Sequence, residues 1–507
     1  MKKILFLLLL FDVNVSAQVI DVSNFSSLDK LMSSDESQTI SVVSSKAIVS
    51  SGKYHTIGLG TKIIYGNNNI LDGQSHKPDS KGKYVRYSGF LIDSKKDVII
   101  RNLTMQNFKD EAVYTSGKAR LDLRGVVNFK NNSGCKNGGA IGASWGSSIN
   151  FSGPSAIFKN NRVISNNVGM ASGGAIYAYD ASINFNGSDV IFTSNMAIGN
   201  NGNGGAVGVY DESTVMFGER VEFSNNIADF NGGAIYITHN SNVTIRGNVE
   251  FIGNNANANG GAIYMIGGML NIETFNGMMS RFIGNKARGK SNAIHLANDA
   301  LLNFNNNAIN AVVDMNDAVT SEGSEAIVNI NGTGQFNLTS KEESIIPNLN
   351  INESSTFNLV SNISLQITEK LKIEKDARFN IGNNKEDIIY VKNYIQEGTL
   401  SFDIFTDTTD TKYCKSDRII TDGKVFLDSA SKLEIFTNGI PMNDRIERKY
   451  VLITYASLKG KFNKKNVIFI DTDLMEEDIN YAIEYKDNRI VFILNPKETR
   501  KLLSAVI

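Results

Sequence analysis

Residues 223–235 read FSNNIADFNGGAI, and residues 251–263, 28 positions further along the chain, read FIGNNANANGGAI. Both segments open with the pattern FxxN and close with GGAI, and the first Gly lies nine positions after the Phe. Self-similarity at a fixed period of roughly 20–50 residues is typical of repeat architectures, in which no single unit can bury its apolar face alone. The two segments therefore predict a solenoid instead of a compact globular core.

The same two motifs extend in both directions from this pair. Between successive GGAI copies the distance is 28 to 35 residues, whereas GGAI is followed by the next Phe after 19 to 22, so length varies mainly between FxxN and GGAI. The FxxN pairs are Phe129/Asn132, Phe158/Asn161, Phe192/Asn195, Phe223/Asn226, Phe251/Asn254 and Phe282/Asn285. The glycine pairs are Gly138/Gly139, Gly173/Gly174, Gly204/Gly205, Gly232/Gly233 and Gly260/Gly261, followed by a worn copy at 291–294.

A third element of alternating polar and apolar residues lies between each GGAI and the next FxxN. It occupies residues 148–151, 182–185, 214–217 and 242–245. Such alternation indicates a short strand, and no stretch of ten or more residues has helical apolar spacing. We therefore predict an all-β chain that forms a right-handed parallel β-helix of roughly fourteen to sixteen coils, each with three short strands and a rise of about 4.8 Å.

The residue types suit this architecture. Equivalent side chains of stacked coils form interior columns, here Phe on Phe and Ile or Val on Ile. An inward Asn amide can accept from one coil and donate to the next, which predicts a buried ladder from Asn132 to Asn285. The paired glycines are expected to supply positive φ and close backbone approach.

Composition bounds the other possibilities. The 51 basic and 52 acidic residues nearly cancel, so no global field favours nucleic acid or an anionic membrane. With 44 Gly, 5 Pro and abundant Asn, the chain favours tight turns over disordered linkers. Two cysteines, Cys135 and Cys414, cannot form a disulfide framework or a four-ligand zinc site, and we expect unpaired thiols many coils apart.

The amino terminus has the pattern of a secretory signal: Lys2-Lys3, an apolar run, and the small-residue site Val15-Ser16-Ala17. A short buried helix or anchor is the alternative. No later apolar run is long enough for a transmembrane helix. We divide the chain into a signal peptide (1–17), irregular N-terminal coils (18–128), the repeat region (129–310), continuing coils (311–395), a C-terminal β region that caps the solenoid (396–495) and a charged tail (496–507). A rise in charged residues makes a boundary near Pro347 plausible.

The coupled GGA[IV] and FxxN copies, over roughly residues 129–295, resemble the repeats of the chlamydial polymorphic membrane proteins and similar autotransporter passengers. A second resemblance is to the C-terminal end of autotransporter passengers, a region that assists passenger folding in such proteins. It is carried by residues 398–400, 416–420, 450–453, 460–462 and 485–491.

The resemblance implies a β-helical passenger that is exposed at the cell surface or released, that acts in adhesion or other host or surface contact, and that is exported through a C-terminal β-barrel. Only about ten residues follow Leu494, and the chain ends at Ile507, so the expected barrel is not encoded here. The chain is then a truncated autotransporter, uses a separate outer-membrane translocator, or stays periplasmic.

Parallel β-helices also include polysaccharide lyases and hydrolases, which need clustered carboxylates with an Arg or Lys. The best candidates for such a site are Asp72, Asp79, Asp93, Asp97 and Arg101, with His55 and His76. Their spacing is irregular and is more typical of solvated side chains and turn caps, so we name none of them as catalytic. The Gly-rich run 199–205 lacks the Lys and Ser/Thr of a phosphate loop and predicts a turn. No cofactor and no metal are expected.

Trp145, the only Trp, directly follows the first GGAI-containing segment and is equally consistent with an exposed contact residue and with a cap on an interior column. The longer loops at 162–172 and 196–203 are where variation is tolerated and binding would be presented. We expect a non-catalytic, adhesin-like passenger whose partners are host-cell or surface glycans or proteins. The alternatives are a pectate lyase-like enzyme that acts on polysaccharides and a non-functional remnant of a broken autotransporter gene.

Overall fold

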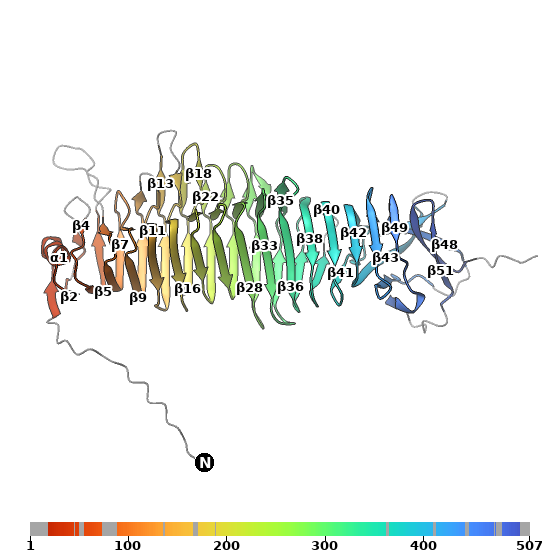
Figure 1. The fold of residues 1–507 in the computed structure, drawn as a ribbon, viewed down its shortest axis with the longest axis horizontal. Coiled ribbons are helices and arrows are strands. Elements are labelled where there is room, and N and C mark those ends of the chain that lie inside the picture. Colours follow the sequence, from red (N-terminus) through yellow and green to blue (C-terminus); the bar gives the residue numbers. More distant parts are fainter. Residues whose placement is uncertain are drawn as a thin grey trace, which may run out of the picture.

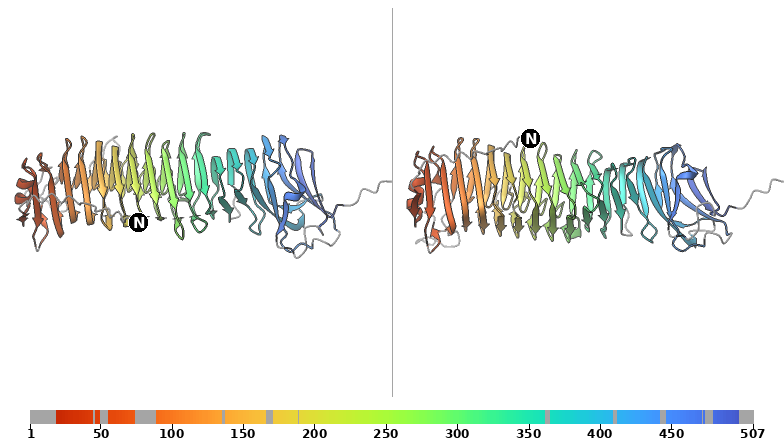
Figure 2. Two further views of the ribbon diagram at one scale, coloured as in Figure 1. Left: turned by 60° about the horizontal axis from the view of Figure 1, so that its bottom comes forward. Right: turned by 90° about the horizontal axis from the view of Figure 1, so that it is seen from below.

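The computed structural model describes residues 19–44, 46–49, 55–73, 89–134, 137–165, 171–187, 189–360, 365–408, 412–441, 446–470, 472 and 479–496. They form a long, straight solenoid with the chain winding steadily from one end to the other (Figure 1). The two turned views keep the same rod shape (Figure 2). This is a parallel β-helix, as the repeats predict.

Each coil contributes strands to three faces. The first face begins with the residues that follow GGA, the second contains the alternating element, and the third contains FxxN. Strands confined to the first face are β4 (His55–Thr56), β6 (Phe90–Ile92), β8 (Val113–Thr115), β19 (Val207–Tyr210), β23 (Ile235–Ile237), β27 (Ile263–Ile266), β32 (Ile294–Ala297), β35 (Val319–Glu322) and β45 (Arg418–Ile420).

The second and third faces are built in the same way. Strands of the second face are β1 (Val19–Val22), β2 (Gln38–Val42), β20 (Thr214–Phe217), β24 (Asn242–Arg246), β28 (Met269–Thr274), β33 (Leu301–Asn306), β36 (Ile327–Gly332), β46 (Lys424–Leu427) and β49 (Ser457–Lys459). Strands of the third face are β3 (Ile48–Val49), β12 (Ser155–Lys159), β16 (Asp189–Thr193), β21 (Arg220–Ser224), β25 (Asn248–Ile252), β29 (Met279–Ile283), β34 (Val312–Met315), β37 (Gln335–Leu338), β39 (Thr356–Leu359), β41 (Arg378–Asn380), β43 (Thr399–Thr408), β47 (Lys432–Phe436) and β50 (Val467–Ile470).

Several long strands bend across two faces. β5 (Lys62–Asp72), β7 (Asp97–Gln106) and β9 (Arg120–Lys130) join the second face to the third. β11 (Ile141–Phe151), β15 (Ile176–Phe185), β38 (Ser344–Ile351), β40 (Leu365–Ile373) and β42 (Ile388–Gln396) join the first face to the second. The place where the first face turns into the second, at residues 144–147 in β11 and 367–370 in β40, is called the first corner below.

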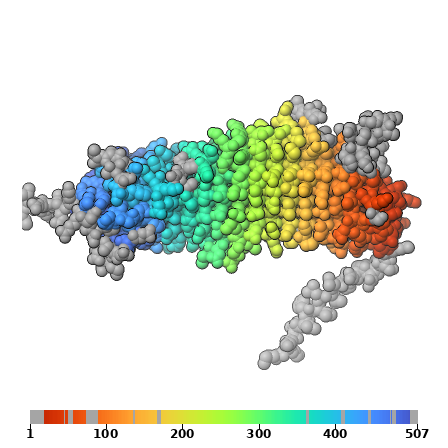
Figure 3. All heavy atoms as spheres, turned by 180° about the vertical axis from the view of Figure 1, so that it is seen from behind, coloured from red at the N-terminus to blue at the C-terminus, as the bar shows by residue number. Residues whose placement is uncertain are grey.

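Within the described residues, seventeen strands of the second face, from β1 to β49, follow one another in unbroken parallel pairing. This is slightly more than the fourteen to sixteen coils expected, because the stacking continues well into the region 396–495. One apolar core runs through the whole stack, from Val22 to Leu494. Seen with all its atoms, the rod is a continuous body without a waist between the parts of the chain (Figure 3).

Pro347 does not mark a boundary. It lies inside β38, where the register slips between Ile346 and Asn348, and the ladder continues to β36 on one side and β40 on the other. A bulge accommodates a residue that lacks a backbone donor, so Pro is tolerated there without a break in the fold. The strand ladder and the apolar core therefore continue past Pro347 without a break.

The repeats contain a fourth short strand after FxxN that the sequence motifs do not reveal. These strands form a separate seven-stranded sheet along one side of the solenoid, and two further short strands pair beside it. The seven are β10 (Ser133–Gly134), β13 (Arg162–Ile164), β17 (Met196–Ile198), β22 (Ile227–Ala228), β26 (Asn255–Ala256), β30 (Lys286–Ala287) and β31 (Lys290–Ser291), and the pair is β14 (Ala171–Ser172) and β18 (Gly202–Asn203). The loops at 162–172 and 196–203 thus carry strands of their own.

Both ends of the solenoid are closed. At the amino end, helix α1 (Phe25–Met32) buries Phe25, Leu28 and Met32 against the first coils. At the other end, β51 (Tyr481–Lys486) and β52 (Arg489–Leu494) form an antiparallel hairpin that pairs with β48 (Arg448–Thr454). β44 (Cys414–Ser416) pairs antiparallel to β43, and η1 (Lys464–Asn466) precedes β50. The C-terminal β region thus both extends and caps the stack.

Candidate ligand-contact surface

The six FxxN phenylalanines lie in one file in the interior. The register pairs each with the next, and neighbouring ring centroids are 4.6 to 5.1 Å apart with planes within 9° of parallel. The file consists of Phe129, Phe158, Phe192, Phe223, Phe251 and Phe282. A second file of Phe151, Phe185 and Phe217 meets the first edge to face. Stacked and edge-to-face contacts each add to the energy of area burial, and the two files fix the distance and register of successive coils.

The Asn residues of FxxN form the ladder that the repeat predicts. The amide of Asn161 donates to the Asn195 Oδ1 (3.1 Å) and to the Phe129 carbonyl oxygen (2.9 Å), and its own Oδ1 accepts from Asn132 N (3.1 Å) and Nδ2 (2.9 Å). Each amide therefore satisfies backbone groups that water cannot reach.

The same bonding continues to the last copy of the motif. The amide of Asn226 donates to the Asn254 Oδ1 (2.9 Å), and the amide of Asn254 donates to the Asn285 Oδ1 (2.9 Å) and to the Phe223 carbonyl oxygen (2.9 Å). Asn254 lies in the turn between β25 and β26, outside both strands, and its equivalents occupy the corresponding turns. All six side chains are completely buried: Asn132, Asn161, Asn195, Asn226, Asn254 and Asn285. The ladder thus joins the coils at a corner, where strand pairing stops.

The ladder ends on a carboxylate that the motif search does not identify. Asp317 accepts from Asn285 N (2.8 Å), Asn285 Nδ2 (2.9 Å), Gly284 N (3.2 Å) and the Ser291 hydroxyl (2.7 Å). An ionised carboxylate only accepts hydrogen bonds, so its side chain cannot donate to the next coil as an asparagine amide does. Asp317 thus explains why the FxxN series stops after Asn285.

The two glycines of each pair have different roles, which corrects the expectation that the pair as a whole supplies positive φ. Only the first glycine is left-handed, with φ from +63° to +74° across the five pairs. These first glycines are Gly138, Gly173, Gly204, Gly232 and Gly260. Glycine is needed at this position because an L side chain is strained in the left-handed region.

The second glycine of each pair does not have positive φ, and the expectation is wrong for these five positions: Gly139, Gly174, Gly205, Gly233 and Gly261. Their role is to leave space. In the first four, a Cβ would collide with the carbonyl oxygen of the equivalent glycine in the next coil. In Gly261, the last of them, it would collide with the carbonyl oxygen of Asn292 in the worn copy. Close backbone approach, the other half of the expectation, therefore belongs to the second glycine.

An aromatic column runs along the outer side of the first face, at the position directly after GGAI. The rings of Tyr236, Tyr264 and His295 stack at 5.5 Å. In the next coil upstream this position is Gly208, and the ring of Tyr210 fills the space beside it, 5.3 Å from the ring of Tyr236. The strand β14 covers part of this column, because Ser172 Oγ lies 2.6 Å from the Tyr210 hydroxyl. Burial raises the pKa of Tyr264 to about 12 and that of Tyr210 well above its ordinary value, so these hydroxyls stay neutral.

Trp145 lies at the first corner and points into solvent. Its side chain is 60% exposed, and its backbone is left-handed, with φ +55°. An L-residue in this region costs roughly 1–2 kcal/mol, and a bulky one is rare there. The Trp145 ring rests against Tyr179 with a centroid distance of 5.5 Å. The Trp145 ring is therefore exposed and does not cap an interior column.

The neighbourhood of Trp145 is polar and acidic. The Tyr179 hydroxyl donates to the Asp211 carboxylate, which raises the pKa of Tyr179. Asp180 and Glu212 are exposed beside it, and Lys118 N donates to the Trp145 carbonyl oxygen (3.0 Å). The rings of Trp145 and Tyr179 thus form an apolar platform with hydrogen-bonding groups at its rim. Such a platform can hold the apolar side of a ligand while the rim fixes its orientation.

The three described carboxylates among the enzyme candidates, Asp72, Asp93 and Asp97, each have a different setting. Asp72 accepts from Gln106 and Asn107, Asp93 pairs with Lys96 at 2.7 Å, and Asp97 is exposed. The Arg101 guanidinium lies over the Tyr65 ring. Asp79, His76 and the side chain of His55 lie outside the described part of the chain. Among the residues that the structure does describe, no group of three or more His, Cys, Asp or Glu is arranged to hold a metal ion.

The Gly-rich run at 199–205 and Cys414 have structural roles in the fold. Gly199 begins a turn in which its N–H donates to Asp229 (2.9 Å), and a strand, not a helix, follows it. Cys414 is half-buried in β44, and burial raises the pKa of its thiol. Cys135 lies outside the described residues.

The comparisons agree with the repeat. The model of the Chlamydia polymorphic membrane protein repeat matches residues 220–238 and 248–265. Each matched segment contains one FxxN and one GGAI, from the third face of one coil to the first face of the next. These two segments are thus repeats of this type. No curated protein matches the chain. None of the helices in the described residues is long and apolar enough to cross a membrane.

Proposed function

We propose that this protein is an exported passenger that is presented at the cell surface or released, and that acts by contact with a host cell or another surface instead of by catalysis. Export through the inner membrane would use the signal peptide at residues 1–17. A separate outer-membrane translocator would complete the route to the surface. The membrane-protein repeat at residues 220–265 supports this location.

One observation carries the proposal: the fold holds Trp145 in a costly left-handed conformation with its ring exposed. The neighbouring coils are also left-handed at this corner, at Lys118, Asp180 and Asp211, so the large exposed ring, and not the backbone, sets Trp145 apart. Aromatic side chains that are anchored on a rigid scaffold are frequent hot spots of binding. The stacked core supplies that rigidity, and the described carboxylates give no arrangement that favours the lyase alternative.

The proposal predicts that Trp145→Gly weakens adhesion without loss of the fold. Glycine removes the ring and also relieves the backbone strain, so stability is expected to be equal or higher. Binding of the fluorescently labelled chain to cultured epithelial cells should fall about tenfold or more. The matched control is Ile309→Ala, since Ile309 is 75% exposed and lies on a different part of the surface.

Unchanged adhesion of Trp145→Gly, or no adhesion of the unmodified chain to any cell type, contradicts the proposal. Incubation with pectins and host glycans, with and without Ca²⁺, tests the enzymatic alternative. Release of shortened or unsaturated products would replace the adhesin with a polysaccharide-active enzyme.

A further inference from the structure

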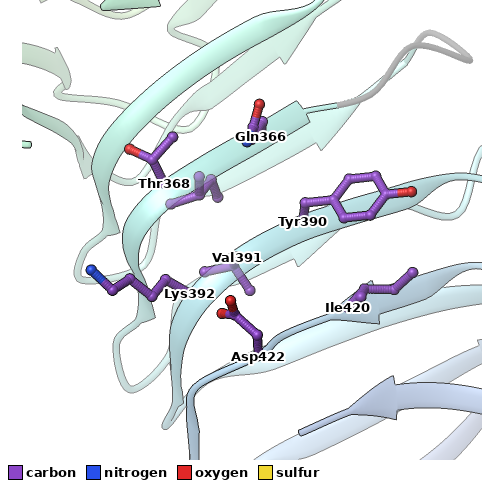
Figure 4. A pocket seen from close by; sticks show the side chains of 8 residues that line it. Gln366, Thr368, Tyr390, Val391, Lys392, Ile420 and Asp422 are labelled. Atoms are coloured by element: carbon purple, nitrogen blue, oxygen red, sulfur yellow. The ribbon is translucent and has the colours of Figure 1, made fainter. Parts of the chain in front are cut away.

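The first corner contains a second distinctive place, downstream of the repeats. A hollow of about 310 Å³ opens there on strands β40, β42 and β45. Two rows of outward side chains border it (Figure 4). Gln366, Tyr390 and Ile420 form one row, and Thr368, Lys392 and Asp422 form the other.

The two rows arise from the local geometry of the strands. Gln366, Tyr390 and Ile420 are direct neighbours in the parallel register, and the second row lies two residues further along each strand. The residues between the rows, such as Ile367 and Val391, point into the core, so the backbone forms the floor. The register slips between Ile367 and Lys370 and bends the face at this point. The result is a groove that runs along the solenoid axis over three coils, a length of roughly 10 Å.

Tyr390 occupies the same outer side of the first face as the aromatic column of the repeats. Upstream, Tyr264 and His295 of that column are 5% and 8% exposed, whereas Tyr390 is 44% exposed. The additional sheet that accompanies the repeats ends at β31, well before β42. The first face therefore presents an exposed aromatic ring at the hollow, whereas the equivalent rings further upstream are buried.

The charges and edges of the hollow restrict its ligand. Lys392 and Asp422 bring opposite charges to one row, and Lys392 is also bonded to Glu369 at 2.8 Å. β42 is paired on both sides in the parallel ladder, so it has no free edge that could bind a peptide as an added strand. An amide, two hydroxyls and an ammonium group surround one aromatic face, together with the carboxylates of Asp422 and Glu369, whose excess negative charge disfavours an anionic ligand. This combination suits a polyhydroxylated ligand that has an apolar side and no net charge.

We propose that this hollow binds a neutral oligosaccharide, with one sugar ring packed on Tyr390 and its hydroxyls bonded to Gln366, Thr368, Lys392 and Asp422. The inference rests on the proposed adhesive function and gives its ligand a chemical class. The site is separate from Trp145, so each can fail without the other.

The test uses the purified full chain and isothermal titration calorimetry with neutral tetrasaccharides of glucose, mannose, galactose and N-acetylglucosamine. At least one should bind, with an affinity that changes little with salt, because no net charge is neutralised. Tyr390→Ala should weaken that binding about tenfold or more, and Tyr390→Phe, which keeps the ring, by less than about threefold. Ile309→Ala is the control and should bind as the unmodified chain does.

Three results would overturn the inference: no binding of any neutral tetrasaccharide, equal binding by Tyr390→Ala, or binding only of charged probes such as tetragalacturonate or a basic peptide. Cell adhesion of the unmodified chain, measured beside its saccharide binding, separates the two proposals. Adhesion without saccharide binding leaves the passenger function in place and removes the hollow from it. Saccharide binding without cell adhesion keeps the hollow and removes the proposed function.

Discussion

At the scale of single residues, asparagine has two roles that its abundance conceals. Asn226 points inward and is completely buried, with four hydrogen bonds that join three consecutive coils. Asn184 points outward on the second face and makes one long amide contact, 3.4 Å, to Asn150. The two side chains are identical in chemistry. Asn226 lies in an inward turn and Asn184 lies at an outward strand position, and this placement decides whether the amide is structural.

Asn226→Ala should therefore destabilise the central coils strongly. The substitution leaves the backbone N–H and the amide of Asn195 without their acceptor inside the core, and an unsatisfied buried group costs about 1–3 kcal/mol. Hydrogen exchange followed by mass spectrometry should show faster exchange in peptides from residue 192 to 254, and urea unfolding should begin at lower concentration.

Asn184→Ala is the matched control, with an expected change within about 0.5 kcal/mol because it lies on the surface. Equal exchange in the two variants would mean that the inward amides add nothing beyond the packing of the phenylalanine file.

At the scale of elements, the short helix α1 closes the open end of the solenoid. The side chain of Asn24 caps the helix by accepting from Ser27 N (2.9 Å), and the buried face of the helix covers the first coil. Without this cover, the apolar interior of that coil would face water, and an open end of a β-solenoid is a template for association.

Leu28→Asp should make the chain assemble into larger species than the unmodified protein forms. Leu28 is fully buried, and a carboxylate at its position would push the helix away from β2. Size-exclusion chromatography with light scattering measures the outcome. Lys30→Ala, on the exposed side of the same helix, is the control. A variant that stays as monodisperse as the control would show that α1 is dispensable as a cap.

The elements differ in how far the sequence reveals them. The FxxN and GGAI strands are predictable, because every coil repeats the same inward residue. Helix α1 has only eight residues and occurs once, so no periodicity marks it. The fourth strand has two or three residues per coil, too few for alternation to be visible. The rise in charged residues near Pro347 suggests a boundary, yet it changes only the outward side chains, and the inward apolar positions continue through β38 and β40.

The surface sites are less accessible to sequence reasoning than the core. Trp145 is conspicuous as the only Trp, yet its exposure depends on a backbone conformation that sequence does not specify. Tyr390 carries no motif at all. Its importance follows from the register that places it beside Gln366 and Ile420, and from the end of the additional sheet upstream. Both facts are properties of the assembled coils.

At the scale of the whole molecule, the two halves of the solenoid bury different polar groups. The repeats use neutral amides, while the described C-terminal part buries four carboxyl groups: Asp387, Asp403, Asp417 and Glu434, of which Glu434 is paired with Arg378. Burial raises the pKa of Asp387 to about 7, with the Asp403 charge adding to this and the Asn383 bond and Lys385 opposing it. Burial also raises the pKa of Asp417 well above its ordinary value. The backbone N–H groups of Asp403 and Asp387, which donate to Asp417, oppose this rise, and the charges of their carboxylates add to it.

The stability of the C-terminal part should accordingly depend on pH. Between the ordinary carboxyl pKa near 4 and the raised value of about 7, the folded state holds a proton that the unfolded chain has released. Stability is then greatest in mild acid and falls as pH rises through this window. Limited proteolysis at pH 5 and pH 8 should show faster cleavage between residues 383 and 438 at the higher pH, with the repeats unaffected.

Asp387→Asn should reduce that difference, because an amide is neutral at both pH values and its oxygen can still accept from Asn383. Asp299→Asn, which alters a carboxylate that is 70% exposed, serves as the reference and should behave as the unmodified chain. Equal cleavage of the unmodified protein at both pH values would contradict the predicted dependence.

The carboxylate at position 317 has a consequence for how this molecule can grow over evolutionary time. A tandem duplication of one coil anywhere before Asp317 adds one more asparagine to the ladder. Its amide oxygen accepts from the preceding coil and its amide nitrogen donates to the following coil, so the lengthened chain remains fully bonded. In a copy inserted directly after Asp317, the asparagine oxygen would face a carboxylate, which has no side-chain N–H to donate to it. Longer and shorter descendants of this chain should therefore differ in the number of windings before that carboxylate, with the part behind it kept at constant length.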